Sequence, residues 1–153
     1  MIEKSLLCLV RITIVVMAIC GIVFNIFLAP MTATDIGNNE IAIVIQCISQ
    51  WIISIPCFGV LILAWIICSN MKIGRLFTFE NAKRIKQASI LLSISIIGFI
   101  IAKVLFYWLG WNKELIVHII IIIVGLTLLV MMMVLSYYIY NAAKLQEESD
   151  FTV

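Results

Sequence analysis

Four long apolar segments alternate with short polar segments along this chain of 153 residues. The apolar segments cover residues 6–29, 41–68, 88–109 and 115–140. Each is long enough to cross the hydrocarbon core of a bilayer as an α-helix, which takes about 20 residues. The connections are too short to hold a soluble domain. The pattern therefore predicts a single all-α domain over residues 1–153, an integral membrane four-helix bundle.

The polar segment 69–87 is the main topological marker. It contains half of the chain's ten Lys and Arg residues, namely Lys72, Arg75, Lys83, Arg84 and Lys86. The segment 31–40, by contrast, carries two acids and no basic residue. Since basic residues concentrate in cytoplasmic connections, the loop 69–87 is expected in the cytoplasm. Four spans then also place the N-terminus and the tail 141–153 in the cytoplasm, an N-in/C-in topology.

Three local signals refine this topology. A signal peptide is the competing interpretation of the first apolar run, but the run is longer than the roughly 7 to 15 residues of an apolar signal-peptide core. Pro56 lies inside the second span and predicts a kink there, because proline removes one backbone hydrogen bond. Small residues in the third span, the pairs Ser89/Ser93 and Gly98/Ala102, predict that it is the central packing helix.

Composition excludes several classes of function. Sixty-five per cent of the residues are hydrophobic, far too many for a soluble globule, and the net charge of +2 comes from basic residues beside the membrane. Direct nucleic-acid binding is not expected. Motifs of metalloproteases, P-loop enzymes and serine hydrolases are absent from the sequence, so we expect no enzyme and no cofactor. His118 alone cannot hold a metal, and the five cysteines are interpreted as packing residues, with palmitoylation of Cys8 and Cys68 as the alternative.

Polar side chains inside the apolar segments are the first place to look for function, because burying them in lipid is costly. Their depths in the spans suggest an intramembrane polar cluster in the outer half of the bundle, made of Asn25, Gln46, Gln50 and Lys103. Such a cluster could be a pocket for a peptide, a lipid headgroup or an anion, with His118 near its mouth. The alternative is hydrogen bonding between helices, with the lysine reaching toward the headgroups.

The two cytoplasmic polar segments form the second candidate. Thr78 is a plausible N-cap, followed by Glu80 in the first turn of a helix that continues into the third span. The acidic tail could dock on the basic loop through weak exposed ion pairs, or remain a frayed end beside a lipid-binding loop. The candidate partner surface comprises Arg75, Phe77, Glu80, Asn81, Lys83, Arg84, Glu147, Glu148 and Asp150.

These two segments also carry a resemblance to a known family. The stretch RLFTFENAKRIKQ and the terminal LQEESDFTV resemble the signatures of small four-span bacterial membrane proteins grouped as domain-of-unknown-function family 2975. The matching positions are Phe77, Glu80, Asn81, Arg84, Glu147, Glu148, Asp150, Thr152 and Val153. The resemblance implies a multi-pass protein of the bacterial cytoplasmic membrane. Members are often encoded beside a small helix-turn-helix regulator, which implies a partner, but the family has no established activity.

Two functions follow as hypotheses. The first is a non-enzymatic sensor or anchor that presents the loop and the tail to a helix-turn-helix regulator. The second is a small transporter component, or an immunity-type protein against membrane-active peptides, that uses the intramembrane polar cluster. The lipid bilayer is a partner in both, and the sequence leaves open whether the protein is a homo-oligomer.

Overall fold

A computed structural model of the chain describes residues 2–28, 40–71, 77–111 and 115–150. These residues form α1 (Ile2–Val23), which continues as the short π-helix η1 (Phe24–Leu28), then α3 (Glu40–Met71), α4 (Phe79–Trp108) and α5 (Leu115–Asp150). No strand occurs in these ranges. The all-α fold class with four long helices is therefore confirmed.

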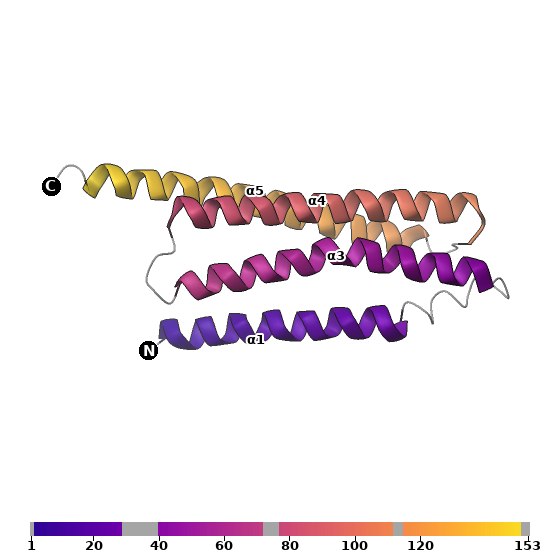
Figure 1. Cartoon of the computed structure of the whole chain (residues 1–153). Coiled ribbons are helices and arrows are strands. Elements are labelled where there is room, and N and C mark those ends of the chain that lie inside the picture. The colour runs from indigo at the N-terminus through magenta and orange to yellow at the C-terminus, as the bar shows by residue number, and fades with distance from the viewer. Residues whose placement is uncertain (1, 29–39, 72–76, 112–114, 151–153) are drawn as a thin grey trace.

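The four long helices run antiparallel in chain order, and both termini lie at the same end of the molecule (Figure 1). At this end α1 begins, α3 ends, α4 begins and α5 ends. We call it the Asn81 end, after the residue that lies at its centre. The antiparallel order places residues far apart in the sequence, such as Arg11 and Cys68, at the same height.

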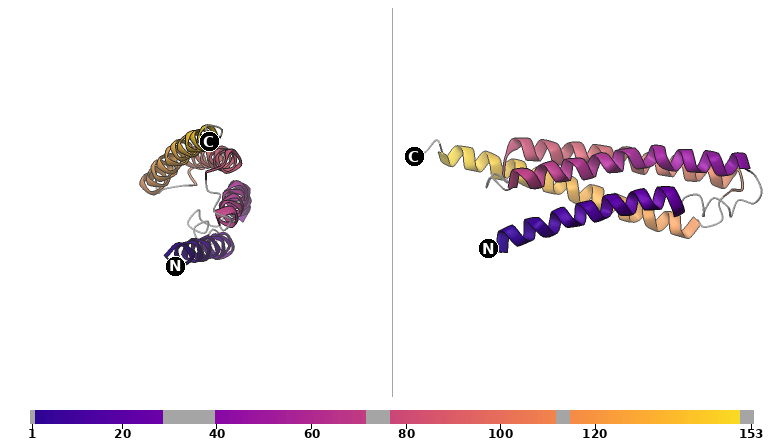
Figure 2. Two further views of the ribbon diagram at one scale, coloured as in Figure 1. Left: turned by 90° about the vertical axis from the view of Figure 1, so that its left-hand side faces the viewer. Right: turned by 60° about the horizontal axis from the view of Figure 1, so that its bottom comes forward.

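The helices are arranged along an open arc. The backbones of α3 and α4 approach each other closely, as do those of α4 and α5, whereas α1 approaches only α3 and η1 among the described elements. Viewed along the helix axes, α1 and α5 occupy the two ends of the arc (Figure 2). The third span was predicted to be the central packing helix, and the close approach of α4 to both α3 and α5 confirms it.

All four helices have the length and composition of membrane spans. Large apolar side chains are exposed along each of them, for example Ile19, Ile52, Ile97 and Ile123. A soluble bundle would bury such residues, whereas lipid accepts them without cost. The chain is a multi-pass membrane protein.

Packing between the helices depends on small residues and on a few buried side chains. A Cβ atom added to Gly125 on α5 would lie 3.2 Å from Cγ1 of Ile96 on α4. Near the Asn81 end, Ala82, Ile85 and Ile139 form a buried cluster that joins α4 to α5, with Ile67 of α3 packed against it. Three helices are therefore tied together at this end.

The helices extend beyond the predicted spans on the Asn81 side. The sequence predicted a span over 88–109 preceded by a helical entrance at Thr78, and α4 indeed starts at Phe79 with Thr78 as its N-cap. The segment 141–150, expected as a polar tail, instead continues α5 to Asp150. Strong helix formers such as Ala142, Ala143 and Leu145 explain this continuation.

Pro56 lies in the interior of α3, as the sequence indicated, and the helix bends near its middle (Figure 1). Ser95 of α4 donates a hydrogen bond of 3.1 Å to the carbonyl oxygen of Ile53, and Cys57 donates to Ser95 Oγ at 3.3 Å. Pro56 has no N–H for the carbonyl of Ile52, and Ser95 donates to the neighbouring carbonyl in the same turn of α3. The bend is thereby coupled to the α3–α4 contact.

Candidate functional site

Thr78 begins the site by capping α4. Its backbone is extended, with φ −129° and ψ 147°, and its Oγ1 accepts a hydrogen bond from the backbone N–H of Asn81 at 3.1 Å. This contact satisfies one of the unpaired N–H groups that every helix start exposes. The cap was predicted from the sequence and is confirmed.

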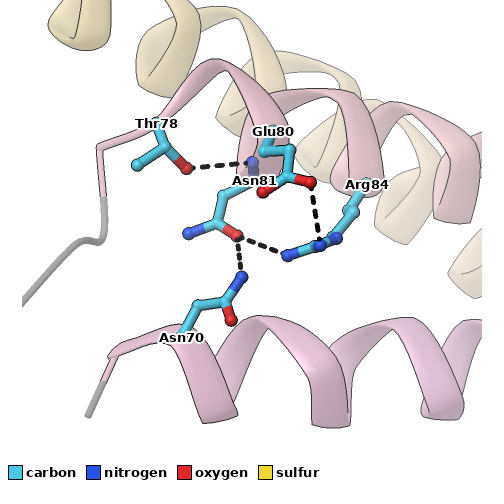
Figure 3. Close-up of polar contacts among 5 residues, drawn as sticks. All are labelled: Asn70, Thr78, Glu80, Asn81 and Arg84. Atoms are coloured by element: carbon cyan, nitrogen blue, oxygen red, sulfur yellow. Dashed lines mark hydrogen bonds and ion pairs between the residues drawn. The ribbon is translucent and has the colours of Figure 1, made fainter. Parts of the chain in front are cut away.

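Asn81 lies at the centre of the site, and its side chain is fully buried with 0% exposure. Its Oδ1 accepts hydrogen bonds from Asn70 Nδ2 at 3.2 Å and from Arg84 Nη1 at 3.4 Å (Figure 3). Asn70 belongs to the last turn of α3, so this one oxygen links the end of α3 to the first turns of α4. Asn81 therefore joins two helices and does not present its own side chain to the outside.

Glu80 completes the network on its exposed side. Its Oε1 lies 3.2 Å from Arg84 Nη2, one helical turn away, so Arg84 bridges the buried amide and the exposed carboxylate (Figure 3). Glu80 also lies in the first turn of α4, where a negative charge interacts favourably with the helix dipole. An exposed ion pair of this kind contributes little to the free energy of unfolding, but it holds the guanidinium toward Asn81.

The C-terminal part of α5 packs on the same turns of α4. Ser136 donates a hydrogen bond to the carbonyl oxygen of Ala82 at 2.9 Å, and the rings of Phe79 and Tyr140 meet edge to face at 5.1 Å between centroids. Ala143 is buried as well, so the contact continues past the apolar part of α5. Beyond it, residues 144–149 form an exposed helical extension.

The remaining predicted surface residues are mostly exposed. Phe77, Lys83, Glu147 and Glu148 all have exposed side chains, and Lys144 pairs with Glu148 at 3.8 Å within α5. This arrangement places positive charge on α4 and negative charge on the extension of α5. Arg75 and the side chain of Asp150 lie outside the described residues, as do Thr152 and Val153.

Two members of the predicted intramembrane polar cluster, Asn25 and Lys103, lie apart in the structure. Asn25 of η1 accepts a hydrogen bond from Ser54 of α3 at 3.0 Å and donates to the carbonyl oxygen of Gly21. Lys103 belongs to α4, to which neither α1 nor η1 approaches closely, and its Nζ lies 5.4 Å from the ring centroid of Phe99. Asn25 and Lys103 therefore occupy separate contacts.

The two glutamines of that cluster differ in burial and in their contacts. Gln46 is buried, and its Oε1 has no hydrogen-bond partner in the described part of the chain. Gln50 is half-buried, and its backbone carbonyl accepts a hydrogen bond from Ser54. His118 lies against the ring of Phe99, with 5.9 Å between centroids. Asn25 and Ser54 form a direct side-chain hydrogen bond between η1 and α3.

A polar contact of Arg11 at the Asn81 end was not predicted from the sequence. Arg11 Nη2 donates to the carbonyl oxygen of Cys68 at 3.2 Å, and its guanidinium lies 5.5 Å from the ring centroid of Trp65. Arg11 lies near the start of the first span, where a long basic side chain is expected to reach toward the headgroups. Its partner is a backbone carbonyl, for which no residue type in the sequence gives a signal.

The site is a set of hydrogen bonds among Asn70, Thr78, Asn81 and Arg84, which we call the joint around Asn81. Within the described ranges, no three His, Cys, Asp or Glu side chains come together as metal ligands would. The cysteines were interpreted as packing residues, but only Cys68 is buried, whereas Cys8, Cys20 and Cys57 are exposed along apolar helices. The joint fixes the relative positions of three helix ends and leaves charged side chains around them.

Comparison with known proteins agrees with this architecture. No curated protein and no solved structure matches the chain. A family model described as "Protein of unknown function (DUF2975)" matches residues 5–153, which includes all four helices and both polar segments at the Asn81 end. The chain therefore belongs to the DUF2975 family of proteins of unknown function.

Proposed function

We propose that the protein is a non-enzymatic membrane sensor or anchor that presents its Asn81 end to a cytoplasmic partner. The observation that carries the proposal is the joint around Asn81, which couples the end of α3 to the start of α4 by buried hydrogen bonds. The part of α5 that leads into the exposed extension is packed on the same turns of α4 through Ser136 and Tyr140. A change in helix packing inside the membrane would therefore move the exposed charges at this end.

Charge supports the choice of this face. Lys83 and Lys86 are exposed on α4, while Glu147 and Glu148 are exposed on the extension of α5. Side chains of both signs on neighbouring helix ends suit a protein partner, because complementary charge gives specificity and speeds association. In the proposed topology this face lies in the cytoplasm of a bacterial cell, since the basic residues concentrate there.

The proposed partner is a small helix-turn-helix regulator, the class that the family resemblance implies. The extension of α5 gives such a partner a short, exposed helix that is continuous with a membrane span. Binding to it would hold the regulator at the membrane, and a shift of α5 against α4 would alter the surface that the regulator meets.

The test is a co-purification. The full chain in nanodiscs and a chain that ends at Asn141 are each mixed with the helix-turn-helix regulator encoded nearest to the gene. We expect the full chain to retain the regulator and the shortened chain to lose it. A variant with Glu147→Lys and Glu148→Lys tests whether the acidic side chains themselves matter. Equal retention by full and shortened chains, or retention by neither, would contradict the proposal.

The transporter or immunity hypothesis is not carried forward. It used the cluster of Asn25, Gln46, Gln50 and Lys103, and no contact among the described residues favours it, since Asn25 and Lys103 lie on elements that do not approach each other. The hydrogen bond between Ser54 and Asn25 instead serves the packing of α1 on α3.

A further inference from the structure

Arg11 is a charged side chain inside a membrane span. The predicted span begins at residue 6, five residues earlier, so Arg11 lies about 7.5 Å along the helix axis from the start of the span. A guanidinium keeps its proton in proteins, and its charge in an apolar environment must be compensated.

The protein compensates this charge only in part. Cys68 belongs to the last turn of α3, whose end carries a partial negative charge from its unpaired carbonyl groups, and Nη2 of Arg11 donates to one of them. The ring of Trp65 adds a cation–π contact. Among the side chains that the structure describes, no carboxylate pairs with Arg11, whereas Arg84 at the same end has Glu80.

The guanidinium also retains unused donors. Nε is buried and has no hydrogen-bond partner among the described residues. Nη1 makes no hydrogen bond within the described part of the protein and, unlike Nε, is not enclosed. An accessible guanidinium N–H near the start of a span, beside an exposed tryptophan ring, is suited to a lipid phosphate.

From this geometry we propose that Arg11 and Trp65 form a binding site for the phosphate of an anionic phospholipid at the seam between α1 and α3. The phosphodiester supplies the missing negative charge and accepts from Nη1, as guanidinium groups and phosphates commonly pair. Trp65 lies beside the glycerol and upper acyl region of the same lipid. This site is independent of the proposed regulator, which would bind the exposed end of α4 and α5.

The ligand is a lipid and not free phosphate because of its position. Arg11 lies within an apolar span, and α1 approaches only α3 and η1, so the other faces of α1 are open to the bilayer. Basic side chains between membrane helices are known to bind anionic headgroups. A soluble anion would have to leave water to reach the same position.

The experiment uses Trp65 as the reporter. In a full-length chain with Trp51, Trp108 and Trp111 replaced by phenylalanine, Trp65 fluorescence is quenched by brominated lipids in vesicles of phosphatidylcholine and phosphatidylglycerol. Quenching with brominated phosphatidylglycerol is compared with quenching with brominated phosphatidylcholine at the same mole fraction. We expect the anionic lipid to be enriched beside Trp65.

Matched variants distinguish binding at Arg11 from the general attraction of anionic lipids to basic residues at this end. Arg11→Gln should lower the preference for phosphatidylglycerol about fivefold, which corresponds to about 1 kcal/mol. Lys86→Gln removes one exposed charge from the same end and should leave the preference nearly unchanged. Arg11→Lys keeps the charge and should keep most of the preference. Equal quenching of each variant by brominated phosphatidylcholine shows that the variants are inserted alike.

The proposal would be overturned by no preference in the chain with Arg11, an unchanged preference after Arg11→Gln, or an equal loss after Lys86→Gln. A preference abolished by inorganic phosphate would overturn it too and would assign the site to a free anion. Absence of quenching by either brominated lipid would mean that another protein chain covers Trp65, which also contradicts a lipid site.

Discussion

Asn70 and Asn81 join the last turn of α3 to the first turn of α4 by a side-chain hydrogen bond of 3.2 Å. The two residues are separated by a connection whose central part, 72–76, lies outside the described residues. The junction of the two helices is therefore defined by an amide pair at their ends. Polar contacts of this kind specify a single arrangement when every buried group is satisfied.

Replacing Asn81 should test this junction directly. Asn81→Ala removes the acceptor for Asn70 and Arg84 and is expected to lower the free energy of unfolding by about 1 to 2 kcal/mol. Gln87→Ala, an exposed amide on the same helix, is the control and should change it by less than about 0.5 kcal/mol. Denaturation in mixed detergent micelles measures both. An equal effect of the two substitutions would show that the buried hydrogen bonds contribute nothing.

The cap of α4 gives a second prediction. Thr78→Ala removes the acceptor for the N–H of Asn81 and should cost about 1 kcal/mol, while Thr78→Ser keeps the hydroxyl and should be nearly neutral. Hydrogen exchange at the Asn81 amide is the local readout and should accelerate only in the alanine variant. Unchanged exchange in that variant would mean that the cap does not protect the helix start.

The hydroxyl groups of α4 permit a matched comparison inside the membrane. Ser95 donates to Ile53 on α3, whereas Ser93 donates to Ser89 within its own helix. Ser95→Ala is expected to cost about 0.6 kcal/mol, the mean for hydrogen bonds between membrane helices. Ser93→Ala should cost less, because no contact between helices is lost. The same detergent denaturation measures both, and a larger cost for Ser93 would reverse the assignment.

Gly125 sets the distance between α4 and α5. A Cβ there would lie 3.2 Å from Ile96, so Gly125→Val must push the helices apart or displace the isoleucine. Overpacking of this kind typically costs about 1 to 3 kcal/mol. Thr127→Val, at an exposed position two residues away, is the control and should be tolerated. If both variants unfold at the same denaturant concentration, the close approach is not needed.

The proposed topology can be checked with reporter fusions. We expect a fluorescent protein fused after Val153 to fold and emit in the cytoplasm. Alkaline phosphatase inserted at Gly110, in the turn between α4 and α5, should be active because it reaches the oxidising side. The reverse pattern would invert the orientation and remove the basis for a cytoplasmic partner. Wild-type expression levels of both fusions are the control.

Sequence patterns were sufficient for the number of helices, the cap at Thr78 and the central place of α4. Each of these follows from local chemistry, such as the length of an apolar run or the side-chain oxygen before a helix. The pairing of Asn70 with Asn81 and of Arg11 with Cys68 could not be predicted. Both pairings depend on which faces of the helices pack against each other. The presence of an amide or a backbone carbonyl in the sequence does not identify its partner.

The intramembrane polar cluster is the opposite case, in which residues were predicted to lie together and two of them do not. Asn25 and Lys103 were grouped because their depths in the bilayer are similar. Depth follows from position along a span, but the neighbour of a side chain depends on the rotation of its helix and on the order of helices in the bundle. Lys103 lies beside Phe99 and Phe106 on its own helix, whereas Asn25 accepts a hydrogen bond from Ser54 of α3.

The open arc has a consequence for how the chain is assembled. Every close helix pair in the described structure joins elements that follow one another in the sequence. Each long helix after the first can therefore pack, when it enters the bilayer during synthesis, against the helix made just before it. Local contacts of this kind favour rapid folding. The order of synthesis is thus also the order in which the helices can pack.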